Sequence, residues 1–266
     1  MHGCTVWVMP LLPPRNIALI EGQGFGAGSI GTGISHAIAL AVGAGDLDET
    51  LRLDPTTDVV AFGRRDVITP GYRHAVAAAT ARGFEAVERL AGGRAAAFTT
   101  GTLSFSWAVP TVDPRAGVQD RFERVSGLMA SAFGQLGADA RVGEVPGEYC
   151  PGSHSVNIGG TIKVMGVGQR LVRGAAHIGG VVVVNEAERI REVLIPVYEA
   201  LGLAWDPATA GALEDVVSGI DLEDVRNAIL AEFAEFATVI PATLPLEVVE
   251  MGRRLASSHR PGLAIG

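Results

Sequence analysis

Residues 147–184 read GEYCPGSHSVNIGGTIKVMGVGQRLVRGAAHIGGVVVV, and this segment decides how we interpret the fold. Its apolar runs and paired glycines predict consecutive strands joined by tight turns, with Gly159-Gly160 as a two-residue hairpin. It contains Cys150, one of two cysteines, and Lys163, the only lysine among 21 Lys and Arg residues. Lysine is a compact donor, whereas arginine is a planar fork. Lys163 therefore suggests a donor aimed at one oxygen, such as a developing oxyanion. The alternative is an ordinary solvated strand residue.

The composition indicates a folded protein with a substantial core. The chain has 266 residues, 48% hydrophobic content and a mean hydropathy of +0.30, enough for one large domain or a domain with an appendage. A net charge of −8 without a basic cluster argues against nucleic acid as a partner. Cys4 and Cys150 are far apart and no Cys/His spacing is typical of a zinc site, so we expect no metal and a reducing compartment.

The N-terminus and the hydropathy pattern predict no targeting or membrane segment. The start, MHGCTVWVMPLLPP, has no basic residue before its apolar run and is interrupted by prolines, unlike a signal peptide. No apolar run approaches the roughly 18 residues that span a bilayer. We therefore expect a soluble, cytoplasmic protein that does not bind membranes.

The pattern along the chain predicts a mixed region followed by a helical one. Strands are expected at 17–20, 59–62, 84–90, 95–98, 103–109, 140–145, 153–158, 161–165, 169–174 and 175–184, the last with a possible break at Gly179-Gly180. Alternation in 103–109 predicts one buried face. Helices are expected at 72–81 and 118–136, and then at 186–201, 212–217, 222–238 and 246–257.

A glycine-rich loop at 21–33 offers a nucleotide-binding alternative. Residues Gly26 to Gly31 fit G-x-G-x-x-G, which in a strand–turn–helix context holds the pyrophosphate of NAD or FAD. Ser35 would then cap a helix through Val42, and Asp54 would lie at a suitable distance for the ribose. A chance match is the competing interpretation, because the chain contains 35 glycines.

Two constellations are typical of reactive or binding sites. Cys150 lies in Tyr-Cys-Pro-Gly at a turn between strands, where a thiol is displayed near amide donors that favour thiolate. A buried structural cysteine is the alternative. The second constellation starts at Arg89 and contains Gly92-Gly93, where paired glycines let the backbone approach a ligand. A glycine hairpin without a ligand is equally compatible with the residues alone.

Together these blocks resemble the biotin/lipoate protein ligase superfamily, in its lipoate ligase and octanoyltransferase branch. The resemblance rests on Arg89-x-x-Gly-Gly-Arg-Ala, on Gly101-Thr102-Leu103, and on Gly160-Thr-Ile-Lys163-Val-Met-Gly166-x-x-Gln169, and it covers residues 58–184. The Tyr-Cys-Pro-Gly segment is similar to octanoyltransferases of the amidotransferase type, which have a cysteine nucleophile. Ligases commonly have a third glycine where Arg94 stands and a histidine near Thr99 and Thr100. The amidotransferase type tends to have Asp where Ser155 stands, so this chain departs from both patterns.

The resemblance implies an α/β fold with a central mixed, largely antiparallel sheet flanked by helices. It implies a catalytic domain over 1–185 and a helical C-terminal extension over 186–266. Cys150 would be the nucleophile, and Lys163 would contact the acyl carbonyl. The expected substrate-binding residues are Arg89, Gly92, Gly93, Arg94, Ala95, Thr102, Gly166, Gln169 and His177; the last lies in the same stretch as Cys150.

The implied activity is transfer of an octanoyl or lipoyl group to the lysine of a lipoyl-carrier protein through a cysteine acyl-enzyme. Implied partners are the glycine-cleavage H protein, the lipoyl domains of 2-oxoacid dehydrogenases, or acyl carrier protein. The transferase needs no cofactor. The alternatives are an ATP- and Mg-dependent lipoate–protein ligase and a non-catalytic acyl- or carrier-binding homologue.

Overall fold

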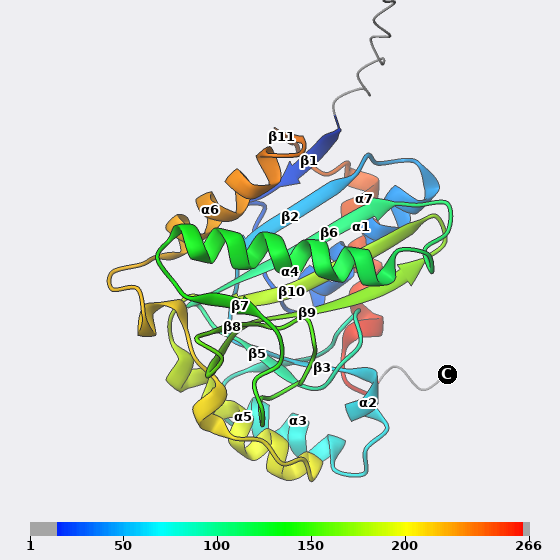
Figure 1. Ribbon diagram of the computed structural model, residues 1–266. Helices are drawn as coiled ribbons and strands as arrows, with labels where there is room; N and C mark the ends of the chain where they lie inside the picture. The colour runs from blue at the N-terminus through cyan, green and yellow to red at the C-terminus, as the bar shows by residue number, and fades with distance from the viewer. Residues whose placement is uncertain (1–14, 263–266) are drawn as a thin grey trace, which may run out of the picture.

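The computed structural model describes residues 15–262, and an eight-stranded mixed sheet runs through it (Figure 1). The strand order is β11 (Thr238–Pro241), β1 (Asn16–Ile20), β2 (Thr50–Pro55), β6 (Thr102–Pro110), β10 (Ala175–Val183), β9 (Ile162–Val172), β8 (Val156–Ile158) and β7 (Ala140–Val142). β1 pairs in parallel with β11 and β2, and the other pairs are antiparallel. The expected mixed, largely antiparallel sheet is confirmed.

Helices cover both faces of this sheet. On one face α4 (Val118–Gln135) packs with α6 (Leu222–Ala234), and α4 crosses the front of Figure 1. On the other face α1 (Ser29–Ala44) packs with α7 (Leu246–Leu255). Trp107 of β6 lies in the α4–α6 core, whereas its neighbour Ala108 lies in the α1–α7 core. Successive strand residues point to opposite faces, so β6 is buried on both, not on one as its alternation predicted.

A small three-stranded sheet lies beside the large one and carries the Arg89 block. Its order is β4 (Glu85–Glu88), β3 (Val59–Phe62) and β5 (Ala96–Phe98). It shares a core with α3 (Tyr72–Thr80) and α5 (Ala187–Leu201). The short helix α2 (Arg64–Val67) follows β3. Because Tyr149 belongs to this core as well, the small sheet is held against the loop that bears Cys150.

Two predicted breaks in the central strands are absent. β9 runs unbroken through Gly166-Val167-Gly168, since Gly166, Val167 and Gly168 each pair with β10. β10 likewise continues through Gly179-Gly180. The turn at Gly159-Gly160 is present, with both residues at positive φ, +60° and +77°. Its predicted two-residue length is wrong, because Ile158 pairs with Ile162 and the loop therefore has three residues, 159–161. Glycines within β9 and β10 therefore serve close packing rather than turns.

The C-terminal region contains a strand that its sequence did not reveal. The helix expected over 222–238 ends at Ala234, and β11 then pairs with β1 at the sheet edge. The segment expected as a helix at 212–217 contains only a short 3₁₀ helix, Leu213–Asp215. Two further 3₁₀ helices lie at Pro207–Thr209 and Ala256–His259. A four-residue edge strand following a helix gives too short a period-2 signal to be recognised. The boundary after residue 185 stays a prediction about domain organisation.

The glycine-rich loop is tied down by the chain's own side chains. α1 begins at Ser29, so Ser35 lies inside the helix and is not its cap. The N–H of Ser29 donates to Glu85 Oε1 at 2.9 Å, which occupies the helix end where a pyrophosphate would bind. Asp54 is ion-paired to Arg52 at 2.6 Å. The nucleotide-binding interpretation of this loop is therefore wrong for this conformation. Within residues 15–262, none of the helices combines the length and apolar character needed to cross a bilayer.

Candidate active site

Cys150 projects from the loop between β7 and β8 in a conformation that other residues enforce. Its φ is +43°, in the left-handed region that non-glycine residues seldom occupy. The Cys150 N–H donates to the Tyr198 hydroxyl at 2.7 Å, and that hydroxyl donates to the carbonyl of Ala95 at 2.9 Å. Tyr198 of α5 thus joins the cysteine loop to the segment before β5. Such over-determined strain is common where a reactive group must be held in place.

The sulfur of Cys150 accepts two hydrogen bonds from the Arg89 block. Arg89 Nη2 lies 3.1 Å from Sγ and the N–H of Arg94 lies 3.2 Å from it. Arg89 Nη2 also donates to the carbonyl of Arg94 at 2.7 Å, which fixes the guanidinium. Gly93 has a φ of +112°, and a Cβ there would lie 2.9 Å from Sγ. Only glycine at this position lets the backbone approach the sulfur so closely.

These neighbours favour the thiolate. Burial alone would raise the pKa of Cys150, but the positive charges of Arg89 and Lys163 and the two hydrogen bonds at Sγ outweigh it. The pKa of this thiol is therefore below its ordinary value. Thiolate is the nucleophilic form of cysteine, so the environment is that of a reactive residue and not of an inert buried one.

Lys163 is a neighbour of Cys150, but its amine is fully engaged. The side chain is 1% exposed, and Nζ donates to Glu148 Oε1 at 2.8 Å, to the Tyr149 carbonyl at 3.0 Å and to the Cys150 carbonyl at 2.8 Å. An ammonium group has three donors, so none is left over. In this structure Lys163 holds the main chain of the cysteine loop and places a positive charge beneath it.

Glu148 is one of the site residues that sequence reasoning missed. Its side chain is fully buried, and Oε1 accepts from Lys163, from the Ser155 hydroxyl at 2.6 Å and from the Gly152 N–H at 3.2 Å. Its Oε2 accepts from the Val145 N–H at 3.0 Å. One carboxylate therefore ties both ends of the cysteine loop to Lys163. The sequence did hold a signal: a single lysine in a buried strand requires an acid partner, and Glu148 is the acid two residues before the cysteine.

A cavity of ≈ 430 Å³ opens at the sulfur and collects most of the expected residues. Its lining includes Cys150, Lys163, Arg89, Gly92, Gly93, Gly166 and Gln169. Phe98, Phe122 and His154 were not expected there; the last two are stacked at 4.8 Å. Gln169 turns its amide to α4, donating to the Val118 carbonyl at 2.7 Å. The lining of the cavity combines apolar side chains with a thiol of lowered pKa.

The remaining expected residues lie elsewhere. The backbone N–H of Arg94 donates to the sulfur, while its side chain forms a salt bridge with Asp66 at 3.2 Å. Ala95 is buried and contributes its carbonyl to Tyr198. Thr102 is fully buried with its hydroxyl on the Thr99 carbonyl, so its side chain serves local packing. Their substrate-binding roles stay predictions.

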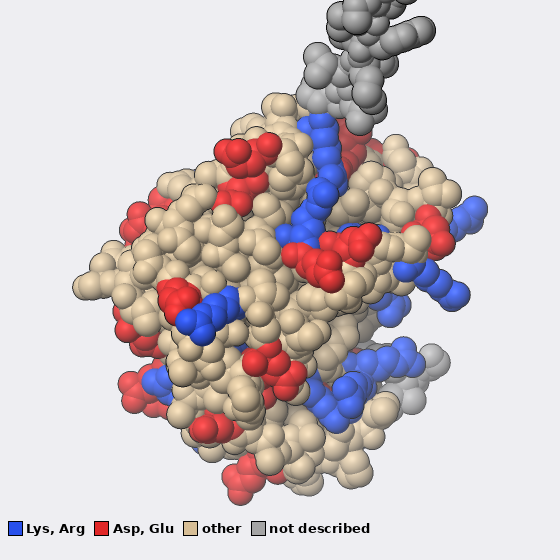
Figure 2. Space-filling model, in the orientation of Figure 1, with Lys and Arg blue, Asp and Glu red and all other residues tan. Residues whose placement is uncertain are grey.

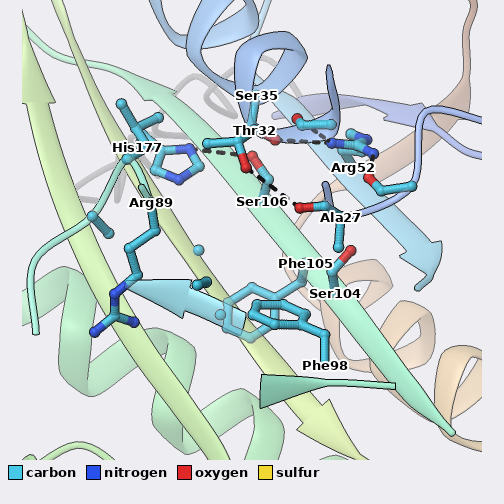
Figure 3. Close-up of a pocket in the computed structure, with 17 residues that line it drawn as sticks. Ala27, Thr32, Ser35, Arg52, Arg89, Phe98, Ser104, Phe105, Ser106 and His177 are labelled. Atoms are coloured by element: carbon cyan, nitrogen blue, oxygen red, sulfur yellow. Dashed lines mark hydrogen bonds between the residues drawn. The ribbon is translucent and has the colours of Figure 1, made fainter. Parts of the chain in front are cut away.

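His177 does not line this cavity but a second, smaller one, to which Arg89 also contributes (Figure 3). Cys4 lies outside the described residues. Among residues 15–262, no cluster of three or more His, Cys, Asp or Glu side chains could hold a metal ion.

Comparison with known proteins connects this geometry to one family. The family model described as the lipoyl protein ligase A/B catalytic domain matches residues 32–234. A Geobacillus kaustophilus protein named octanoyl-[GcvH]:protein N-octanoyltransferase is 33% identical over 184 residues, covering 69% of this chain but only 64% of the relative, less than two thirds of its length. An Exiguobacterium sibiricum protein of the same name is 28% identical over 76% of this chain and 80% of the relative.

Solved structures show the same fold. A lipoate-protein ligase A bound with ATP matches with a TM-score of 0.72 at 18% identity, covering 91% of this chain and 94% of the other. A bi-partite lipoate protein ligase from Thermoplasma acidophilum matches with a TM-score of 0.69 at 19% identity, covering 91% of both chains. At such identities the likeness establishes the fold and not the reaction.

Proposed function

The chain belongs to the lipoyl protein ligase A/B catalytic-domain family, and on that premise we propose that it is an acyltransferase with Cys150 as its nucleophile. It moves an octanoyl or lipoyl group from a donor carrier to the lysine of an acceptor lipoyl-carrier protein. The relatives named octanoyl-[GcvH]:protein N-octanoyltransferase support this activity and point to the glycine-cleavage H protein as a carrier. The lipoyl domains of 2-oxoacid dehydrogenases are the proposed acceptors.

One observation carries the proposal: a thiol of lowered pKa at the end of an apolar-walled cavity. In this cavity Sγ combines nucleophilicity with two convergent donors, the Arg89 guanidinium and the Arg94 N–H. Because both donors lie within hydrogen-bond distance of Sγ, they lie close to the oxygen of an acyl group that becomes bonded to Sγ. They are therefore well placed to stabilise the oxyanion of a tetrahedral intermediate, an effect usually worth several kcal/mol.

The proposed reaction has two balanced half-reactions. The Cys150 thiolate attacks the acyl carbonyl of the donor amide, the C–N bond breaks, and the departing lysine amine takes up a proton. The thioester on Sγ is then attacked by the acceptor lysine amine, the C–S bond breaks, and the thiolate is regenerated as the amine loses a proton. Splitting one transfer into two steps in this way is typical of covalent catalysis and gives ping-pong kinetics.

The main role of Lys163 in this proposal is to hold the cysteine loop and to place a positive charge near the thiol. It supports the carbonyls of Tyr149 and Cys150 and lowers the thiol pKa. Direct donation to an acyl oxygen, as the family resemblance implies, requires Nζ to exchange one of these carbonyls for the substrate. We keep that exchange as part of the proposal.

We further propose that transfer proceeds without ATP, because the acyl group arrives already bonded to a carrier. The related structure with ATP bound makes the ligase the alternative to test. A lipoate- and ATP-dependent exchange of pyrophosphate would identify a ligase, and its absence together with carrier-to-carrier transfer would identify a transferase. We place the reaction in the cytoplasm, where a reducing environment keeps such a thiol free.

Intact mass spectrometry after mixing the protein with octanoylated H protein tests the nucleophile. The expected result is an octanoyl adduct that maps to Cys150, is released by added acceptor domain, and is absent in Cys150→Ala. Cys4→Ser is the matched control, since it removes the other cysteine, and it should retain the adduct. Acyl transfer by Cys150→Ala at the wild-type rate would refute the covalent route.

A further inference from the structure

Both half-reactions proposed at Cys150 require a proton to be moved at a lysine nitrogen. In the first, the departing nitrogen must gain a proton as its bond to the acyl carbon breaks. In the second, the acceptor nitrogen must lose a proton as it bonds to the acyl carbon. A side chain that carries such a proton typically accelerates the step by about 100- to 10,000-fold. That side chain has to line the catalytic cavity.

Most titratable side chains in the lining of this cavity are unsuited to the task. Lys163 directs all three ammonium protons to protein oxygens. Arg89 keeps its charge and is bonded to the sulfur. Burial raises the pKa of Tyr149, so its hydroxyl keeps its proton. Imidazole is the side chain that ordinarily exchanges a proton between pH 5 and 8, and His154 is the histidine that lines the cavity.

Contacts with α4 and with a neighbouring serine hold His154 in place. The ring of Phe122 is stacked on the imidazole, with the ring centroids 4.8 Å apart and an angle of 15° between the planes. The Ser126 hydroxyl donates to the His154 carbonyl at 2.8 Å. Nδ1 of the imidazole lies 3.1 Å from the Ser153 hydroxyl. These contacts fix both the plane of the ring and its place on the cavity wall.

The other ring nitrogen of His154, Nε2, is the basic one. It lies 3.1 Å from the side-chain nitrogen of Gln119, which can only donate. Nε2 therefore accepts, and the proton of the neutral ring lies on Nδ1, towards Ser153. Gln119 is exposed at the start of α4, so a lysine that arrives from solvent can take its place at Nε2. A protonated ring also finds a partner, because the Gln119 amide can turn over and accept from Nε2.

An exposed carboxylate lies beside this approach. Gln119 donates to Glu123 Oε1 at 2.9 Å, and Figure 2 shows acidic side chains on the surface over α4. The nearby arginines are engaged elsewhere: Arg121 with β9 and two backbone carbonyls, and Arg124 over an aromatic ring. A lysine ammonium that approaches Gln119 is therefore attracted by Glu123.

We infer that His154 is the acid and the base of the reaction, a role that rests on the proposed acyl transfer at Cys150. In the first half-reaction the imidazolium gives its Nε2 proton to the lysine nitrogen as the amide C–N bond breaks and the C–S bond forms. In the second, the neutral ring takes a proton from the acceptor nitrogen as the new C–N bond forms and the C–S bond breaks.

Protons and electrons balance over this cycle. The thiolate and the imidazolium are both restored at the end of the second half-reaction. The acceptor ammonium gives one further proton to solvent before it attacks, and the departed amine takes one up from solvent, so these two cancel. The cycle needs no reactant other than the two carriers.

Two octanoyl donors with different leaving groups test the inference. Octanoylated H protein releases an amine that must be protonated, whereas 4-nitrophenyl octanoate releases a phenolate that leaves as an anion. Intact mass spectrometry follows the acylation of Cys150 in a single turnover. His154→Gln retains hydrogen-bonding capacity but cannot carry a proton. It should be slowed at least about 100-fold with octanoylated H protein and should react with the ester at the wild-type rate.

The ester measures the thiol alone, since His154 is not among the groups that lower the pKa of Cys150. His74→Gln is the matched control, because His74 is exposed on α3, and both of its rates should equal those of the wild type. Equal slowing of His154→Gln with both donors would show a purely structural role and would overturn the inference. Unchanged rates with both donors would overturn it as well.

The pH dependence of the wild type gives a reading that needs no variant. With octanoylated H protein the acylation rate should pass through a maximum, because it requires both the thiolate and the imidazolium. With the ester the rate should rise with pH to a plateau, because it requires the thiolate alone. Profiles of the same shape would refute the role of His154 while leaving the acyl-enzyme intact. A wild type that forms no adduct with octanoylated H protein would refute the transfer chemistry itself.

Discussion

The Glu148–Lys163 pair should govern both the stability of the cysteine loop and its reactivity. Glu148→Gln removes the charge opposite Lys163 while preserving shape. Its carbonyl oxygen can still accept the three bonds that Oε1 receives. Its NH₂ group, however, would face the Val145 N–H that now donates to Oε2, so one hydrogen bond becomes a repulsion between donors.

The size of the effect follows from these contacts. A hydrogen bond to a charged group contributes about 1.5–3 kcal/mol, and breaking a fully buried ion pair costs about 3–5 kcal/mol. Because the amide retains part of the network, we expect Glu148→Gln to lower the free energy of unfolding by about 2–4 kcal/mol. That is a large share of the about 5–15 kcal/mol of a typical domain.

A double-mutant cycle measures the coupling between the two residues. Urea denaturation gives the free energy of unfolding of the wild type, Glu148→Gln, Lys163→Met and the double variant. The double variant should be less destabilised than the sum of the single variants by about 1.5–3 kcal/mol, because it leaves no buried charge unpaired. Glu144→Gln is the control, since Glu144 is exposed in the same loop and should change stability by less than about 0.5 kcal/mol. A Glu148→Gln variant as stable as this control, or a cycle without coupling, would refute the reasoning.

Three further predictions follow from the same geometry. Arg89→Met removes the nearest positive charge from Sγ and should raise the pKa of Cys150. The pH profile of Cys150 alkylation by iodoacetamide should therefore move to higher pH. A profile that does not move would contradict the explanation of the lowered thiol pKa. Tyr198→Phe leaves the Cys150 N–H without an acceptor and should cost about 1–3 kcal/mol in urea denaturation, together with slower acylation. Burial lowers the pKa of His36 to about 4 and that of His177 to about 3, whereas the unfolded chain binds these protons near pH 6.5. Between the folded and unfolded pKa values of these histidines, the unfolded state therefore binds more protons than the folded state. The free energy of unfolding should fall as pH drops from about 6.5 to 4, and it should fall less steeply in His36→Gln.

Patterns within the sequence were sufficient for the elements whose signal is local. The strand at Val59–Phe62 has the predicted bounds, and the helix starting at Val118 is within a residue of them. The turn at Gly159-Gly160 was also predicted, though not its three-residue length, because positive φ at two successive positions selects glycine. β11 was not predicted, because its place at the sheet edge depends on pairing with β1, more than two hundred residues earlier in the chain.

The sequence by itself determined the choice of Cys150 and Lys163 as candidate residues and the family resemblance, since both depend on residue types and motif spacing along the chain. The sheet type was implied by that resemblance. Only the tertiary structure decided what surrounds them. Arg89 reaches Sγ across 61 positions of sequence, and Glu148 occupies the amine of Lys163. Such contacts arise where the small sheet packs against the cysteine loop, and no local pattern encodes which buried charge will meet which partner. The lowered pKa of the Cys150 thiol is a product of that packing.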